Sequence, residues 1–221
     1  LFANWFADQG AGEVILAARR DVRDVDPDGV KAIEAKGTRV TTVKADSGDR
    51  GQVADMMASV KAHSLPLGGV IHAAGILSDA FIMNQDMASF EKVMAPKLAG
   101  AWYLHEETKD MELDMFVLFS SLSSLLGAPG QANYAAANAF LDGLAYHRRG
   151  LGIPATAINW GPWGEVGMAA NSQVEANAKA SGVHLIDPQV GLDWFNMVLQ
   201  GNPVQRGLMV IDWAALANMT G

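Results

Sequence analysis

Residues 116–150 read FVLFSSLSSLLGAPGQANYAAANAFLDGLAYHRRG and join two different patterns in one stretch. The run 116–119 is continuously apolar, which is typical of a strand buried on both faces of a parallel sheet. A helix is predicted from about 134 to 149, and Gly150 is the signal that ends it. A buried strand followed by a helix is the repeating unit of an α/β fold.

The rest of the chain repeats this alternation. Further strands are predicted at 13–17, 39–43, 69–73, 155–160 and 208–211. Further helices are predicted at 1–9, 50–62, 89–107 and 189–199, with Ser47 able to cap the second. Pro96 predicts a kink or a restart inside 89–107, because proline removes one backbone hydrogen bond of a helix. We therefore expect a doubly wound, Rossmann-like parallel sheet.

The chain starts on a helical pattern rather than on a strand. Residues 1–9 look like the helix of a first β–α unit, and the sequence contains no Gly-x-Gly-x-x-Gly turn. We therefore expect a sheet that lacks its first strand and glycine-rich turn in this chain. Residues 1–221 are interpreted as a single, N-terminally truncated catalytic domain.

Composition excludes several kinds of protein. Half of the 221 residues are hydrophobic and only 18% are charged, which predicts a large buried core. A formal charge of −8 argues weakly against a nucleic-acid partner, which needs clustered cations. The sequence has no cysteine, and its five histidines are scattered without a metal-binding spacing. The absence of cysteine fits a cytoplasmic location. No apolar run approaches the ~18–20 residues of a membrane span.

Four polar residues form a pattern that suits carbonyl reduction. Ser121 follows the strand 116–119, and Tyr134 comes thirteen residues later in the first turn of the next helix. Because ligands bind beyond the carboxyl ends of parallel strands, both can reach one crevice. Asn138 lies one turn after Tyr134 on the same face, and Lys97 on the preceding helix could complete the set.

Reduction of a ketone needs a proton at the oxygen as negative charge develops there. A Tyr hydroxyl could supply it, a nearby Lys would lower the pKa of that hydroxyl, and a Ser hydroxyl would hold the carbonyl oxygen. An Asn could position a water that returns the proton. Taken singly, each of these residue types is more often a surface or capping residue, and spacing alone does not decide between the two interpretations.

The wider sequence resembles a known family. The matching segments are 116–121, 127–131 and 134–142, with upstream HAAG at 72–75 and APKLAGAW at 95–102, and downstream NWGPW at 159–163. Together they closely resemble the ketoreductase domains of modular polyketide synthases, within the short-chain dehydrogenase/reductase superfamily. The resemblance covers nearly the whole chain.

The resemblance implies roles for the four polar residues. Tyr134 becomes the general acid, Ser121 orients the carbonyl, and Lys97 and Asn138 complete a catalytic tetrad. Most of the superfamily has the Lys four residues after the Tyr, where this sequence has Asn138. The exchanged arrangement is a feature of the polyketide and animal fatty-acid synthase ketoreductases.

The resemblance also implies NADPH as the cofactor. An Arg at the end of the second strand would face the adenosine 2′-phosphate, for which a guanidinium is a good partner. An Arg pair in solvent at a strand end is the alternative. The residues implied in cofactor binding are Arg19, Arg20, Asp46, Ser47, His72, Ala73, Ala74, Gly75, Trp160, Gly161 and Pro162.

The stereochemical class is predicted from short motifs. Leu77-Ser78-Asp79 resembles the Leu-Asp-Asp motif of B-type ketoreductases, with Ser78 in place of the middle Asp. A-type enzymes have a Trp eight residues before the Tyr, where this chain has Leu126; Pro129 and Asn133 also fit the B-type pattern. The expected product has a D-configured hydroxyl, although Asp79 could instead cap a helix.

A substrate lid is expected at about 164–185. The residues expected to face the substrate are Leu77, Asp79, Gln131 and Met168, although Met168 could equally fill the core. The helix 189–199 is expected to pack Trp194, Phe195 and Val198 on the sheet.

The resemblance implies reduction of the β-keto group of a β-ketoacyl thioester to a β-hydroxyacyl thioester. The partners implied are an acyl carrier protein, which presents the chain on phosphopantetheine, and other domains of the same synthase. Neither a nucleic acid nor a membrane is expected as a partner. Two alternatives stay open: a non-catalytic, ketoreductase-like scaffold, and a free-standing reductase of small ketones.

Overall fold

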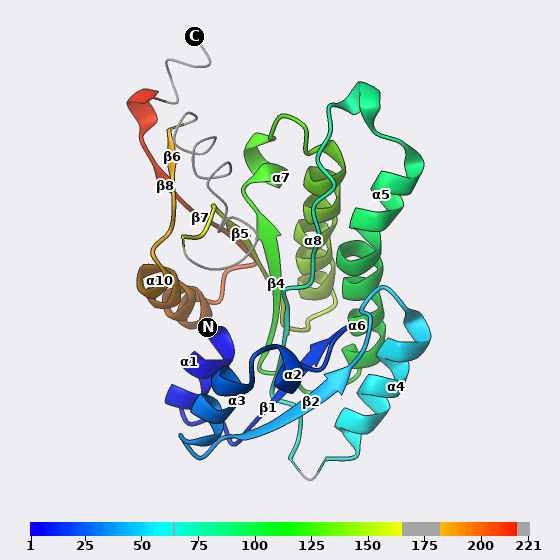
Figure 1. The fold of residues 1–221 in the computed structure, drawn as a ribbon, viewed down its shortest axis with the longest axis vertical. Coiled ribbons are helices and arrows are strands. Elements are labelled where there is room, and N and C mark those ends of the chain that lie inside the picture. The colour runs from blue at the N-terminus through cyan, green and yellow to red at the C-terminus, as the bar shows by residue number, and fades with distance from the viewer. Residues whose placement is uncertain (64, 165–181, 216–221) are drawn as a thin grey trace.

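The computed structural model describes residues 1–63, 65–164 and 182–215. Its centre is a parallel sheet of four strands in the order β3 (Gly69–His72), β4 (Met115–Ser121), β5 (Thr156–Trp160) and β7 (Gln205–Leu208). Figure 1 shows these strands between helices. The α/β architecture predicted from the alternating patterns is confirmed.

Two further strands form a separate parallel ladder. β1 (Glu13–Ala18) pairs with β2 (Arg39–Lys44) in continuous register from Glu13 opposite Arg39 to Ala18 opposite Lys44. The connection between them carries α2 (Val22–Val25) and α3 (Pro27–Glu34). Among the described residues, no strand is hydrogen-bonded between β1 and β3. The parallel strands therefore form two separate ladders in the described part of the chain.

Helices cover both faces of the four-stranded sheet, because its strands are apolar on both faces. Phe116 and Leu118 of β4 pack in a core with α4 (Arg50–Lys61), α6 (Gly100–Thr108) and α8 (Ala132–Gly150). Val117 and Phe119 point the other way, into a core with α1 (Phe2–Asp8) and α10 (Pro188–Gly201). Figure 1 shows these two sets of helices on opposite sides of β4. This is a doubly wound arrangement.

The predicted helix 89–107 consists of three pieces. α5 (Met87–Met94) leads into a π-helical turn at Ala95–Ala99, and α6 follows directly. The restart expected at Pro96 is confirmed. The wider turn accommodates the missing backbone N–H of Pro96.

Two local predictions were wrong, the cap of α4 and the extent of the last strand. The cap of α4 is Asp49 rather than Ser47, because the Asp49 carboxylate accepts from Gln52 N at 3.0 Å. The end of α8 at Gly150 is confirmed, while the positive φ of 79° that a glycine tolerates lies two residues later, at Gly152.

The predicted strand 208–211 is also divided. β7 ends at Leu208, and β8 (Val210–Ile211) pairs with β6 (Val183–His184) in a small antiparallel sheet. Gly161 N, one residue after β5, donates to Leu208 O at 2.8 Å, so the hydrogen bonding between β5 and β7 continues one residue beyond β5. Trp194, Phe195 and Val198 of α10 lie in the core beside the sheet, as predicted. No helix in the described part of the chain is both long and apolar enough to cross a membrane.

Candidate active site

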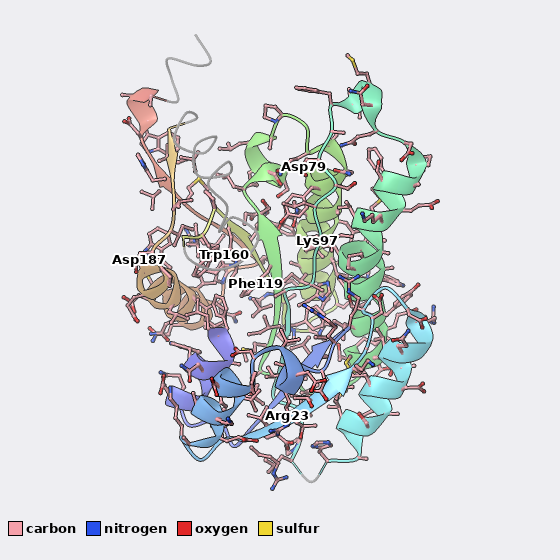
Figure 2. All side chains as sticks on the ribbon, viewed as in Figure 1. Arg23, Asp79, Lys97, Phe119, Trp160 and Asp187 are labelled. Atoms are coloured by element: carbon pink, nitrogen blue, oxygen red, sulfur yellow. The ribbon has the colours of Figure 1, made fainter. Side chains whose placement is uncertain are left out.

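Lys97 is buried by the π-helical turn. Its side chain is only 3% exposed, and Nζ donates to Phe119 O of β4 at 2.9 Å. The same Nζ lies 5.4 Å from the centre of the Tyr134 ring. Figure 2 shows Lys97 beside α8, with Phe119 on the neighbouring strand. Residues 37 positions apart in the sequence therefore come together, as predicted.

Burial alters the acidity of Lys97. Loss of water lowers the pKa of its amine to about 8, and the negative charge of Asp142 opposes the shift. Gly75 makes room for this side chain. A Cβ at Gly75 would lie 2.9 Å from Lys97 Cε, closer than carbon atoms approach without displacement. The small residue after β3 therefore allows Lys97 to reach the end of β4.

Tyr134 and Asn138 share one face of α8. Asn138 Nδ2 donates to Tyr134 O at 2.8 Å, while Asn138 Oδ1 is buried and accepts nothing from the described residues. Burial raises the pKa of the Tyr134 hydroxyl, and the side chains of Asn138 and Ser121 oppose the shift. The pKa is raised rather than lowered as expected, because burial outweighs the contributions that favour the phenolate. The hydroxyl therefore keeps its proton at neutral pH.

Ser121 is the last residue of β4. Its Oγ accepts from Ser123 N at 3.2 Å, at the start of α7 (Ser123–Leu126). Its side chain also belongs to the surroundings that set the pKa of Tyr134. All four residues of the predicted tetrad thus lie around the carboxyl end of β4, where a parallel sheet binds ligands.

The residues predicted to bind the adenosine end lie at the carboxyl ends of β1 and β2. Arg19, Arg20 and Lys44 line a pocket of about 490 Å³, together with Asp21, Asp24 and Val25. A neighbouring pocket of about 240 Å³ shares Arg19 and Lys44 and includes Asp46. Ser47 lines neither of these two pockets; its hydroxyl donates to Pro96 O at 3.4 Å.

His72 and Trp160 end β3 and β5, the two strands on either side of β4. Burial and the positive charge of Lys97 lower the pKa of His72 to about 4, so its ring is neutral at physiological pH. His72 Nε2 and Trp160 Nε1 are buried and have no hydrogen-bond partner among the described residues. Gly161 would carry a Cβ only 3.4 Å from Leu208 O. Unsatisfied polar atoms therefore gather at the edge where a cofactor is expected.

The loop at 77–80 is fastened to the start of α8. Gln131 Nε2 donates to Asp79 Oδ2 at 2.9 Å, and Asn133 Nδ2 donates to Ser78 O at 2.9 Å. Ala80 N adds a bond to Gly130 O at 2.9 Å. Asp79 does not cap the next helix, because Asp86 is the side chain that caps α5. Figure 2 shows Asp79 near this end of α8.

Two predictions concern the substrate side of the site. Leu126, at the position of the A-type Trp, is 54% exposed. Met168 and most of the expected lid at 164–185 lie outside the described residues.

Three polar residues near the tetrad have no predicted role: the buried Asp142 and Asn159, and the half-buried Ser124. Asp142 lies one turn after Asn138 on α8 and is 9% exposed. The sequence does place Asp142, an acidic residue, on the helix face that carries Tyr134 and Asn138. That spacing alone does not show what the carboxylate contacts.

Comparison with known proteins decides the family. The model of the KR domain family matches residues 1–165. The chain belongs to the KR domain family. One relative is a phenolphthiocerol/phthiocerol polyketide synthase from Mycobacterium tuberculosis, 36% identical over 210 residues. That match covers 95% of this chain and 9% of the relative, so the chain spans a small part of that protein.

Solved ketoreductase structures share this fold. One described as A-type ketoreductases from a modular polyketide synthase superposes with a TM-score of 0.95 at 36% identity, covering 99% of this chain and 46% of that one. A short-chain dehydrogenase/reductase from Serratia marcescens has a TM-score of 0.78 over 93% of this chain and 89% of its own. At 18% identity it shows the fold alone. The predicted ketoreductase family is thus confirmed.

Proposed function

We propose that this ketoreductase domain uses NADPH to reduce the β-keto group of a β-ketoacyl thioester carried on an acyl carrier protein. The observation that carries the proposal is the buried Lys97 amine, which lies beside the Tyr134 ring and bonds Phe119 O just before Ser121. A non-catalytic domain has no need to keep a desolvated amine at this position, since burying it costs free energy.

The four residues divide the work on the carbonyl. The Ser121 hydroxyl holds the carbonyl oxygen at the end of β4, and Tyr134 donates its proton to that oxygen as charge develops. The raised pKa keeps this proton on Tyr134 until it is needed. Lys97 then stabilises the phenolate by its charge, and Asn138 Oδ1 is free to hold a water that returns the proton. NADPH, when bound, supplies the hydride.

The residues present fit such a cofactor. Arg19, Arg20 and Lys44 offer three cations around one pocket, which suits a 2′-phosphate better than a free ribose hydroxyl. The unpartnered His72 Nε2 and Trp160 Nε1 lie at the ends of β3 and β5, where the rest of a dinucleotide would run. We expect Ala73, Ala74, Gly75 and Pro162 to line this part of the site as well.

We propose a D-configured hydroxyl product. The B-type motif loop at 77–79 is fastened to Gln131 and Asn133, and no Trp stands at the position of Leu126. The A-type ketoreductase structure is only 36% identical, so the stereochemistry of this chain rests on its own residues. Chiral chromatography of the hydroxyacyl product tests the assignment, and an L-configured product would contradict it.

The function is tested with the protein in its full natural length. We expect oxidation of NADPH in the presence of a β-ketoacyl-N-acetylcysteamine thioester, with a higher rate when an acyl carrier protein presents the chain. NADPH binding without turnover of either substrate would refute the reductase, and failure to bind NADPH would favour the scaffold. Equal efficiency on free small ketones would favour the free-standing reductase.

The choice of cofactor has its own test. Arg19→Ser removes one guanidinium from the pocket, so the Kd for 2′,5′-ADP should rise about tenfold or more, while that for 5′-AMP changes little. Lys36→Ser is the control, since Lys36 pairs with Asp8 away from the pocket. Equal losses for both nucleotides would contradict a 2′-phosphate site.

A further inference from the structure

A polar cluster lies where β4, β5 and α8 meet. It consists of the buried Ser120, Asp142 and Asn159 and the half-buried Ser124. The carboxylate of Asp142 is its centre. Oδ2 accepts from Ser124 Oγ at 2.7 Å, and Asn159 Nδ2 lies 2.9 Å from Oδ1 and 3.0 Å from Oδ2. Asn159 is fully buried, so water does not compete for these bonds.

The cluster is connected to Ser121 through Ser124. Ser124 Oγ lies 2.8 Å from Ser121 O as well as 2.7 Å from Asp142 Oδ2. A hydroxyl has one hydrogen, so the two acceptors share one donor. Asn159 Nδ2 is a further donor toward Ser121 O, at 3.4 Å. The hydrogen bond that Asp142 accepts from Ser124 therefore affects the hydrogen bonding of Ser121 O at the end of β4.

The cluster is also connected to α8 at the turn that carries the tetrad. Ser120 Oγ donates to the backbone oxygen of Asn138 at 3.2 Å. Ser120 in turn accepts from Asn159 Nδ2 at 3.1 Å. The same buried amide thus joins the strand that carries Ser121 to the helix that carries Tyr134 and Asn138.

We propose that Asp142 is a positioning residue of the reductase site, which holds the end of β4 against α8 through Ser124 and Asn159. The proposal rests on the reduction proposed above. Asp142 touches neither cofactor nor substrate in this role. It fixes the distance between the Ser121 and Tyr134 hydroxyls that must meet at one carbonyl oxygen.

The charge of Asp142 gives a second effect that a structural residue would not have. The titratable groups that face the Lys97 amine are His72 from β3, and Tyr134 and Asp142 from α8. His72 is neutral near pH 7 and Tyr134 is protonated, so Asp142 is the group among these that favours the Lys97 ammonium. Removing its charge should lower the pH at which Lys97 loses its proton.

The test is Asp142→Asn, which keeps the shape of the side chain but removes its charge and turns one acceptor into a donor. We expect kcat to fall about tenfold or more, with KM for NADPH and for the thioester within about twofold of the wild type. The alkaline limb of the kcat/KM profile should move to lower pH. Asp110→Asn, at an exposed position after α6, is the matched control and should change none of these.

Ser124→Ala separates the two effects. It removes the bridge between Asp142 and Ser121 but leaves the carboxylate, so kcat should fall at least about threefold while the alkaline limb stays in place. A folded Asp142→Asn protein with wild-type kcat and an unmoved limb would overturn the proposal. If Asp142→Asn does not fold, wild-type kcat in Ser124→Ala overturns it. An inactive wild-type protein would refute the proposed function itself.

Discussion

The buried amine of Lys97 predicts how the activity depends on pH. Its pKa of about 8 lies below the ordinary 10.5 because the amine is buried. The kcat/KM profile reports groups of the free enzyme, so kcat/KM should fall as the pH rises through about 8. A kcat/KM that stays constant up to pH 10 would contradict this.

The same shift predicts the opposite trend for stability. Between pH 8 and 10.5 the unfolded chain binds the Lys97 proton more tightly than the folded protein, so the free energy of unfolding should rise with pH there. The gain is on the order of 3 kcal/mol for a shift from 10.5 to about 8. Urea denaturation at both ends of this range measures it, and Lys97→Met should lack the gain.

Gly75 is a second residue whose role can be measured. Gly75→Ala places a Cβ 2.9 Å from Lys97 Cε, so the end of that side chain must shift relative to Phe119 O. We expect kcat to fall about ten- to a hundredfold with the fold retained. Gly143→Ala is the matched control on α8, where the added methyl meets nothing within 4 Å.

The control has its own expected result. Gly143 is exposed inside a helix, so Ala there should leave kcat unchanged and add about 0.5–1 kcal/mol to the free energy of unfolding. If both substitutions left kcat unchanged, Gly75 would have no part in placing Lys97.

At the scale of one element, the π-helical turn Ala95–Ala99 decides where Lys97 lies. Pro96→Ala restores the backbone N–H and removes the need for a wider turn, so an ordinary α-helical turn can form and carry Lys97 away from Tyr134. We expect kcat to fall about tenfold while the melting temperature stays the same or rises.

Pro188→Ala tests proline removal where no wide turn exists, since Pro188 is the first residue of α10 and needs no donor there. It should leave kcat unchanged. Wild-type kcat in Pro96→Ala would show that the π-helical turn does not hold the amine in place.

Elements could be predicted where one local pattern governs them. The apolar run at 116–119 became β4, because a strand buried on both faces needs nothing else to define it. Ser47 and Asp49 are both good capping residues in one short segment, and residue type alone does not say which of them directly precedes the first helical residue. The run 208–211 divided because its two halves find different partners, β5 and β6.

At the scale of the whole molecule, the candidate site could likewise be predicted only in part from the sequence. The tetrad could be predicted because the family motif spans it, and the fold brings Lys97, Ser121, Tyr134 and Asn138 to one end of β4. The bonds around Asp142 join β4, β5 and α8, and no sequence spacing encodes contacts between three elements. The division between β1–β2 and the four-stranded sheet likewise depends on how the elements pack.

The most direct test of the account is Tyr134→Phe, which removes one hydroxyl and keeps the ring against Lys97. The measurement is NADPH oxidation with a β-ketoacyl-N-acetylcysteamine thioester, together with the Kd for NADPH by fluorescence. We predict a loss in kcat of about a hundredfold or more, with the Kd within about twofold of the wild type. An unchanged kcat would show that Tyr134 does not deliver the proton and would contradict the account.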